Sequence, residues 1–106
     1  MDIASDVQEK TRIAVKVKFS PDWDVIVYND NTTPVDIVID CLEDVFDMDD
    51  ATAYDMVEKI QASNEQCMIV ATYPEKLAKV RAKKAMAYVH EEGYEDFTVE
   101  AKVRKE

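Results

Sequence analysis

The polar residues best placed to do chemistry form a short run, residues 29–33, between an apolar segment and a proline. The carboxylate of Asp30 and the amide oxygen of Asn29 can accept hydrogen bonds from a cation, each charge-assisted bond contributing about 1.5–3 kcal/mol. The same residue types are also frequent in any turn that leads from a strand into a helix. The run therefore predicts either a cation-binding site or a structural turn.

Elsewhere, the side chains that could act as bases, nucleophiles or metal ligands lack partners at a useful spacing. His90 is the only histidine, and we expect it on the surface of a helix. Cys41 and Cys67 have no histidines at zinc-binding spacing, so we expect reduced thiols in the core. With Gly93 as the only glycine, the chain cannot form a glycine-rich phosphate loop. The sequence therefore predicts a non-enzymatic protein with no catalytic residue, metal or cofactor.

The composition is that of one small globular domain with an acidic surface. The chain has 106 residues, of which 47% are hydrophobic, and a net charge of −10. An overall negative charge repels phosphate backbones and argues against nucleic-acid binding. No apolar run approaches the roughly 20 residues of a membrane span, and the acidic start lacks the apolar segment of a secretory signal. We therefore expect a cytoplasmic protein that binds neither nucleic acid nor membrane.

The charge is distributed unevenly along the chain. Residues 21–70 contain one lysine and thirteen acidic residues, whereas residues 71–106 contain eight basic and seven acidic residues. Runs of this kind are usual on solvated surfaces that keep a protein soluble. The functional alternative is that the acidic stretch favours a cationic ligand, while the basic run within residues 76–84 favours an acidic surface on a partner protein.

Hydrophobic periodicity divides the chain into strands, where apolar and polar residues alternate or apolar residues run together, and helices, where apolar residues recur every three or four positions. The order β-α-α-β-α-β predicts an α+β sandwich of three helices on a small antiparallel sheet. The pattern gives strands over 23–28, 67–73 and 97–103, a helix from Pro34, a second helix after 47–49 that ends at 62–64, and a third helix from Pro74 to about Glu92.

Several details of these elements are also predictable. Thr33 is expected to cap the first helix, with Pro34 in its first turn. The continuous apolar run of residues 67–73 predicts the most covered strand of the sheet. Gly93 is expected to end the third helix in the left-handed conformation. Residues 1–22 are expected to form an N-terminal arm, which is either flexible or contributes an extra strand.

Residues 25–42, which read Val-Ile-Val-Tyr-Asn-Asp-Asn-Thr-Thr-Pro followed by an apolar helix, resemble the bacterial Clp protease adaptor family ClpS. That family shows a strand, then Asn-Asp-(Asp/Asn)-x-Thr-Pro-Met, then a helix. Residues 78–82 and 91–94 are similar to its third helix and the turn after it. The resemblance covers residues 23–100 and implies a ClpS-like adaptor domain over 23–106, with the fold shared by the C-terminal domain of ribosomal protein L7/L12.

The resemblance also implies a function and the residues that carry it. A ClpS-like adaptor binds the N-terminal residue of a substrate protein and delivers that protein to an AAA+ Clp ATPase of the ClpA or ClpC type, and we expect it to be a monomer. By position, the residues for the substrate α-amine are Asn29, Asp30 and Gln61. Those for the side-chain pocket are Asn31, Thr33, Val35, Val38, Val57 and Ile60, and those for the ATPase contact are Arg81, Lys76 and Thr32.

The sequence departs from the family pattern at three positions of the substrate-binding site. Gln61 stands where the family has a histidine, and Val35 stands where it has a methionine. The pocket leucine that follows the third helix falls on Asp96, or on Phe97 if the register shifts by one. The alternative prediction is therefore a divergent ClpS-fold module that binds another ligand, or that modulates a Clp ATPase without recognising N-terminal residues. A stalk-like or purely structural domain is a third possibility.

Overall fold

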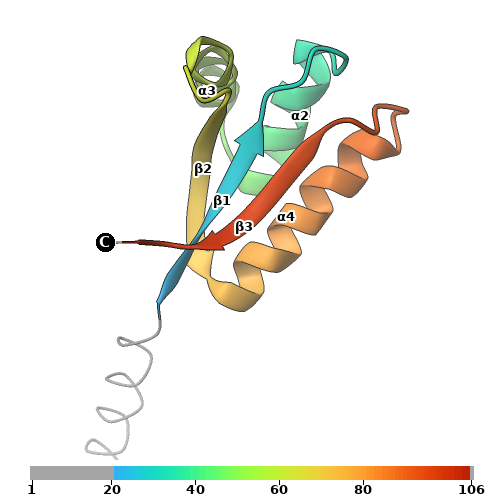
Figure 1. The fold of residues 1–106 in the computed structure, drawn as a ribbon. Helices are drawn as coiled ribbons and strands as arrows, with labels where there is room; N and C mark the ends of the chain where they lie inside the picture. Colours follow the sequence, from blue (N-terminus) through green and yellow to red (C-terminus); the bar gives the residue numbers. More distant parts are fainter. Residues whose placement is uncertain (1–20, 106) are drawn as a thin grey trace, which may run out of the picture.

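The computed structural model describes residues 21–105, and the predicted arm lies almost entirely outside them. The six elements occur in the predicted order, and Figure 1 shows the helices packed on one side of the sheet. This confirms the α+β sandwich. The elements are β1 (Asp22–Tyr28), α2 (Val35–Phe46), α3 (Asp50–Ala62), β2 (Cys67–Pro74), α4 (Glu75–His90) and β3 (Thr98–Val103).

The three strands form an antiparallel sheet in the order β2-β1-β3, so β1 is the central strand. Val25 and Val27 of β1 are 0% and 1% exposed and form the middle of the core. The prediction that residues 67–73 form the most covered strand is wrong, because β2 lies at an edge and pairs on one side only. In β2 only Val70 is buried, whereas Ile69 is 47% exposed.

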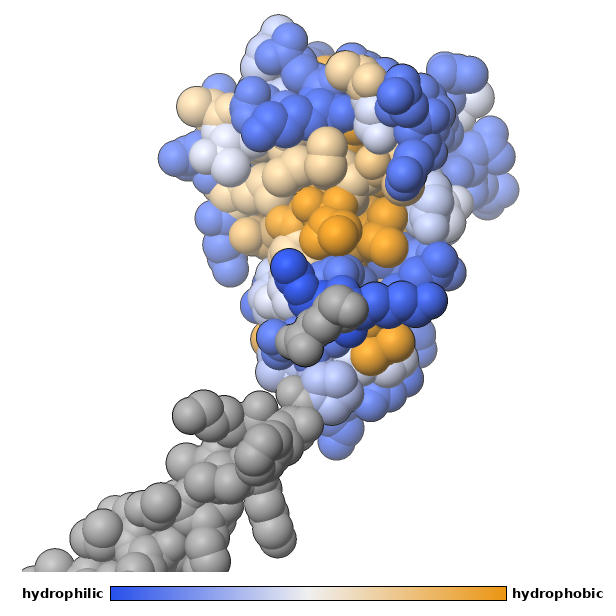
Figure 2. Space-filling view, turned by 60° about the vertical axis from the view of Figure 1, so that its left-hand side comes forward, coloured by the Kyte–Doolittle hydropathy of each residue, from blue (hydrophilic) through white to orange (hydrophobic). Residues whose placement is uncertain are grey.

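A register shift in the β1–β2 ladder explains how a continuous apolar run fits an edge strand. Val25 pairs with Ala71 and Ile26 pairs with Ile69, so Val70 is the extra residue of a bulge and turns into the core. Figure 2 shows one face of the molecule, on which apolar side chains gather in the middle and polar ones surround them. The apolar run is therefore divided between the core and the surface.

The helices cover the sheet through a stripe of small side chains on α4. Ala78, Ala82 and Ala85 are buried, and α4 packs against β1 and β3 on one side and α2 on the other. Small residues at these positions let the helix lie close to the sheet, as the sequence predicts. Because α3 packs against α2 and β2, the C-terminal end of α3 is brought beside the start of α2 at one end of the sheet.

The start of α2 differs from the predicted cap. Pro34 is the N-cap residue and makes no side-chain bond to the helix, while its carbonyl oxygen accepts from the backbone of Ile37 and Val38. The Thr33 hydroxyl donates to the carboxylate of Asp30 in a charge-assisted bond, and Thr33 lies one residue before the N-cap. At α3 the predicted start is confirmed, since the Asp49 side chain accepts from the backbone N–H of Thr52.

At the other end of the chain, α4 ends at His90, two residues earlier than predicted, and Gly93 has a left-handed φ of 97° as predicted. His90 is not simply a surface residue, because its Nε2 atom lies 2.9 Å from the carbonyl oxygen of Phe97. This contact ties the end of α4 to the segment that enters β3.

The two thiols are both free but differ in environment. Cys41 is fully buried, and burial raises its pKa to about 12, which makes it an unreactive core thiol. Cys67 is only half-buried, so the prediction of a core thiol is wrong there. Among residues 21–105, no cluster of His, Cys, Asp and Glu could hold a metal ion, and no helix is long and apolar enough to cross a membrane.

Candidate functional site

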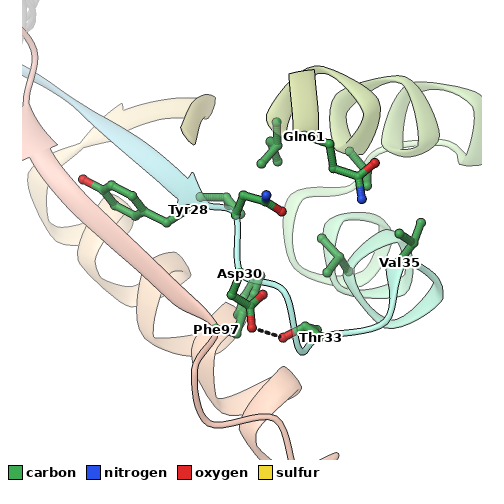
Figure 3. Close-up of a pocket in the computed structure, with 11 residues that line it drawn as sticks. Tyr28, Asp30, Thr33, Val35, Gln61 and Phe97 are labelled. Atoms are coloured by element: carbon green, nitrogen blue, oxygen red, sulfur yellow. Dashed lines mark hydrogen bonds between the residues drawn. The ribbon is translucent and has the colours of Figure 1, made fainter. Parts of the chain in front are cut away.

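A pocket lies where the end of β1, the start of α2 and the end of α3 meet. It contains about 320 Å³ of space free of atoms, its open mouth included. Figure 3 shows the side chains around it. The lining residues are Val27, Tyr28, Asn29, Asp30, Thr33, Val35, Val38, Val57, Ile60, Gln61 and Phe97.

The interior of the pocket is apolar and belongs to the core. Val27, Val38, Val57, Ile60 and Phe97 are all buried, and each comes from a different segment or a different turn of a helix. They are close-packed with the rest of the core, so the walls of the pocket are held rigidly. An apolar side chain that entered here would lose its contact with water, which stabilises a complex by about 25 cal/mol per Å² of apolar surface buried.

The mouth of the pocket is polar, and Asp30 is the only charged residue that lines it in the part of the chain that the structure describes. One carboxylate oxygen of Asp30, Oδ2, accepts hydrogen bonds from two hydroxyls, that of Thr33 at 2.7 Å and that of Thr32 at 2.9 Å. Figure 3 shows the bond to Thr33 across the turn. These bonds fix the orientation of the carboxylate, and within residues 21–105 they leave Oδ1 available as an acceptor.

Asn29 and Gln61 contribute amide groups to the same mouth. The backbone N–H of Asn29 donates to the carbonyl oxygen of Gln66 at 2.8 Å, so the residue is anchored to the loop between α3 and β2. Gln61 lies in the last turn of α3 and is exposed. Figure 3 shows Gln61 and Val35 on the helices that flank the opening, across from Asp30. The mouth therefore presents one carboxylate and two amides, and none of the described lysines or arginines lines it.

The structure thus brings eight predicted α-amine and pocket residues to one place and leaves one apart. Asn31 does not line the pocket and is exposed on the turn. The residues found together are Asn29, Asp30, Gln61, Thr33, Val35, Val38, Val57 and Ile60.

The three residues predicted to contact an ATPase are spread over the surface. Thr32 lies in the turn after β1 and bonds to Asp30, whereas Lys76 follows Pro74, which pairs with Asp22 at the opposite end of β1. Arg81 is half-buried in the middle of α4.

Arg81 also has bonding partners within the domain. Its guanidinium donates to the carbonyl oxygen of Val45 near the end of α2 and lies 5.9 Å from the centre of the Tyr73 ring. Part of its donor capacity is therefore used to join α2 to α4. Arg81 consequently has a structural role beside any role in binding a partner.

Sequence reasoning missed two lining residues and left one undecided. Val27 is predictable in hindsight as an inward position of an alternating strand, and Tyr28 ends that strand. Figure 3 shows that the Tyr28 ring points away from the opening, and its hydroxyl donates to Glu100. Of the two candidates after α4, Phe97 lines the pocket and is 1% exposed, whereas Asp96 is exposed and does not line it.

Comparisons with known proteins, by sequence and by fold, agree with the resemblance to the ClpS family described above. The family model for ClpS, the ATP-dependent Clp protease adaptor protein, matches residues 18–95. The chain is 32% identical over 87 residues to the ATP-dependent Clp protease adapter protein ClpS of Vibrio atlanticus (strain LGP32), covering 82% of this chain and 78% of that relative.

A solved structure of Agrobacterium tumefaciens ClpS2 bound to L-phenylalaninamide is similar in fold. It superposes with a TM-score of 0.72 at 21% sequence identity, over 80% of this chain and 99% of that one. The family match covers most of the described domain and includes every residue that lines the pocket except Phe97. This chain therefore belongs to the ClpS family of Clp protease adaptors, which are substrate adaptors and not enzymes.

Proposed function

We propose that the pocket binds the N-terminal residue of a substrate protein, with its α-ammonium at the mouth and its side chain in the interior. The observation that carries this proposal is the pairing of Asp30, Asn29 and Gln61 with a buried apolar cavity, which no cationic side chain among residues 21–105 lines. The Agrobacterium ClpS2 structure, whose ligand L-phenylalaninamide has a free α-amine and an aromatic side chain, supports the same arrangement.

The chemistry of the mouth matches that of an α-ammonium group. An ammonium has three hydrogen-bond donors and one positive charge, and the mouth offers one carboxylate and two amide oxygens. Each charge-assisted bond contributes about 1.5–3 kcal/mol when both partners are held in place. An acetylated N-terminus has lost the charge and two of the three donors, so acetylation is expected to remove most of this binding energy.

The proposal is tested by fluorescence anisotropy with short labelled peptides that begin with Phe, Leu, Tyr, Trp or Met. Each peptide is used with a free and with an acetylated N-terminus. Micromolar or tighter binding that acetylation abolishes is the expected result. If none of the free peptides binds, or if acetylated peptides bind equally well, the α-amine site is wrong.

In that case the alternative stands, a divergent ClpS-fold module with another ligand. Two observations favour it: Gln61 stands where the family has a histidine, and Val35, which lines the pocket, has a shorter side chain than the methionine of the family. Pull-down experiments for the partner protein would then identify the ligand.

We further propose that this protein delivers its substrates to an AAA+ Clp ATPase of the ClpA or ClpC type, as a monomer in the cytoplasm. Family membership supports a Clp ATPase as the partner. Lys76 is an exposed, positively charged residue of α4 that does not line the pocket. Lys76→Glu is expected to weaken ATPase binding, while Lys102→Glu on β3, with the same change of charge, leaves it unchanged.

Arg81→Glu tests the second predicted contact residue on α4 but needs a stability control. The Arg81 guanidinium donates to Val45, so its loss also loosens the contact between α2 and α4. The thermal midpoint of this variant is therefore measured beside its affinity for the ATPase. Equal affinities of the wild type and both charge-reversal variants, Lys76→Glu and Arg81→Glu, would remove these two residues from the proposal.

A further inference from the structure

We propose that Gln66, which does not line the pocket, is a positioning residue that orients the Asn29 amide so that its oxygen is free to accept from the substrate α-ammonium. This inference rests on the proposed function, since it concerns how the mouth of that pocket is arranged. Gln66 lies in the loop between α3 and β2, 37 positions from Asn29 along the chain.

A chain of three groups determines which way the Asn29 amide points. The carbonyl oxygen of Ser63 can only accept, and the Gln66 Nε2 atom donates to it at 2.9 Å. The other end of the Gln66 amide, Oε1, therefore faces Asn29 and accepts from its Nδ2 atom at 2.8 Å. Because an amide carries its nitrogen and oxygen on different sides, the Asn29 Oδ1 atom is directed away from Gln66.

The contact between Gln66 and Asn29 is doubled by the backbone. The Asn29 N–H donates to the Gln66 carbonyl oxygen at 2.8 Å, next to the side-chain bond of the same length. Two bonds between the same two residues restrict both the position and the rotation of Asn29. Without the side-chain bond, the amide could turn its nitrogen toward the pocket, and a donor there would oppose an ammonium group.

The backbone of Gln66 gives an independent reason to look for a role of its side chain. Its φ angle is 59°, in the left-handed region where glycine is at ease and a glutamine is strained. Strained residues of this kind persist where the surrounding structure and a function require them. A turn alone would be formed at least as well by glycine, so the glutamine side chain adds something that the turn does not need.

The experiment compares Gln66→Gly with the wild type, using the free-amine peptide that binds best. The substitution removes the side-chain bonds and relieves the backbone. We expect the thermal midpoint to stay the same or rise, and the affinity to fall about three- to tenfold, the effect of one misdirected hydrogen bond. Unchanged affinity would overturn the proposal. A purely structural role predicts instead a lower thermal midpoint.

Two further variants separate the orienting bond from other effects. Gln66→Glu loses the donor to the Ser63 carbonyl oxygen but keeps an acceptor for the Asn29 nitrogen, which is the bond that orients the Asn29 amide. It is therefore expected to bind like the wild type at about 1 M salt, where the added charge is screened within about 3 Å. Asn64→Ala changes an exposed residue of the same loop and is expected to have no effect. A fall in affinity for Asn64→Ala as large as that for Gln66→Gly would show that the loop acts only through its general order.

A readout without ligand distinguishes a failure of this inference from a failure of the proposed function. In a nitrogen-15 spectrum, the side-chain amide of Asn29 is expected to exchange slowly with solvent in the wild type and in Gln66→Glu, and faster in Gln66→Gly. If no peptide binds but this pattern is seen, Gln66 orients Asn29 and the ligand is wrong. If peptides bind and the pattern is missing, the positioning role is wrong.

Discussion

Asp30 and Thr33 are joined by an O–H···O hydrogen bond of 2.7 Å across the turn that leads from β1 into α2. This charge-assisted bond fixes the orientation of the carboxylate. A second hydroxyl, that of Thr32, donates to the same oxygen. Both hydroxyls of the turn therefore hold one carboxylate at the mouth of the pocket.

The role of the Asp30 charge is tested by Asp30→Asn. The asparagine is nearly identical in shape and keeps one oxygen for the two hydroxyls, but it has no charge to offer an ammonium group. We expect affinity for a free-amine peptide to fall at least tenfold, and the free energy of unfolding to change by no more than about 1 kcal/mol.

Isothermal calorimetry and denaturant titration of the same samples measure the two quantities for Asp30→Asn. Asn31→Ala, at an exposed position outside the pocket, is the matched control and is expected to alter neither. A variant that lost several kcal/mol of stability but kept its affinity would show that Asp30 is a structural turn residue.

The pH dependence of binding is tested by Gln61→His. Glutamine does not titrate, so Gln61 adds no pH dependence to wild-type binding between pH 5.5 and 7.5. Above about pH 8 the affinity decreases, because the substrate α-amine loses its proton. A histidine at this position would gain a charge as the pH falls through about 6.5 and then repel the ammonium. We therefore expect the variant alone to bind more weakly at pH 5.5 than at pH 7.5.

Peptide anisotropy at matched ionic strength measures this difference. Gln61→Asn, which is shorter but equally unable to titrate, controls for the change in shape. If Gln61→His showed the same pH profile as the wild type, residue 61 would not lie near the bound amine.

A hydrogen bond on the open face of the sheet gives a pH effect on stability. The Tyr28 hydroxyl donates to Glu100 at 2.7 Å, which lowers the pKa of Glu100 and, together with burial, raises the pKa of Tyr28 to about 12. Because the pKa of Glu100 is lower in the folded protein, this group stabilises the fold at pH values above its unfolded pKa, near 4.5. That stabilisation is lost as the pH falls through the folded pKa. The contribution of Tyr28 to the stability of the fold is complete below pH 10 and is lost as the pH rises toward 12.

Tyr28→Phe is therefore expected to cost up to about 1 kcal/mol at pH 7, since both side chains are partly exposed, and clearly less at pH 3. Denaturant titrations at the two pH values measure the difference. An equal cost at both would mean that the bond to Glu100 does not contribute to stability.

The close approach of α4 to the sheet is tested by overpacking. Ala85 is 0% exposed, and Ala87, two residues along the same helix, is exposed. Ala85→Leu forces extra volume into a filled core and is expected to cost about 1–3 kcal/mol of unfolding free energy. Ala87→Leu changes the helix propensity by the same amount but adds no volume to the core. We therefore expect its free energy of unfolding to change by no more than about 0.5 kcal/mol. Similar losses for the two variants would contradict the close packing.

Local patterns predicted the elements because their signals lie within a few residues. A run of β-branched and aromatic residues predicted β1, the spacing of apolar residues predicted the three helices, and Gly93 has its predicted left-handed conformation in the turn after α4. The predicted cap of α2 was wrong because the helix begins one residue later than the pattern indicates, with Pro34 at the N-cap position. Most of the pocket was predictable because it belongs to one continuous segment, residues 27–38, and one face of α3.

The sequence by itself determined which residues could meet an ammonium group and which could line an apolar cavity, because residue types and short spacings set that chemistry. Only the tertiary structure decided that β1 and not β2 is the central strand, that Phe97 and not Asp96 lines the pocket, and that Gln66 contacts Asn29. These outcomes depend on pairing between segments far apart in the chain. A shift of one residue in such a pairing exchanges an inward side chain for an outward one, and no local pattern records that register.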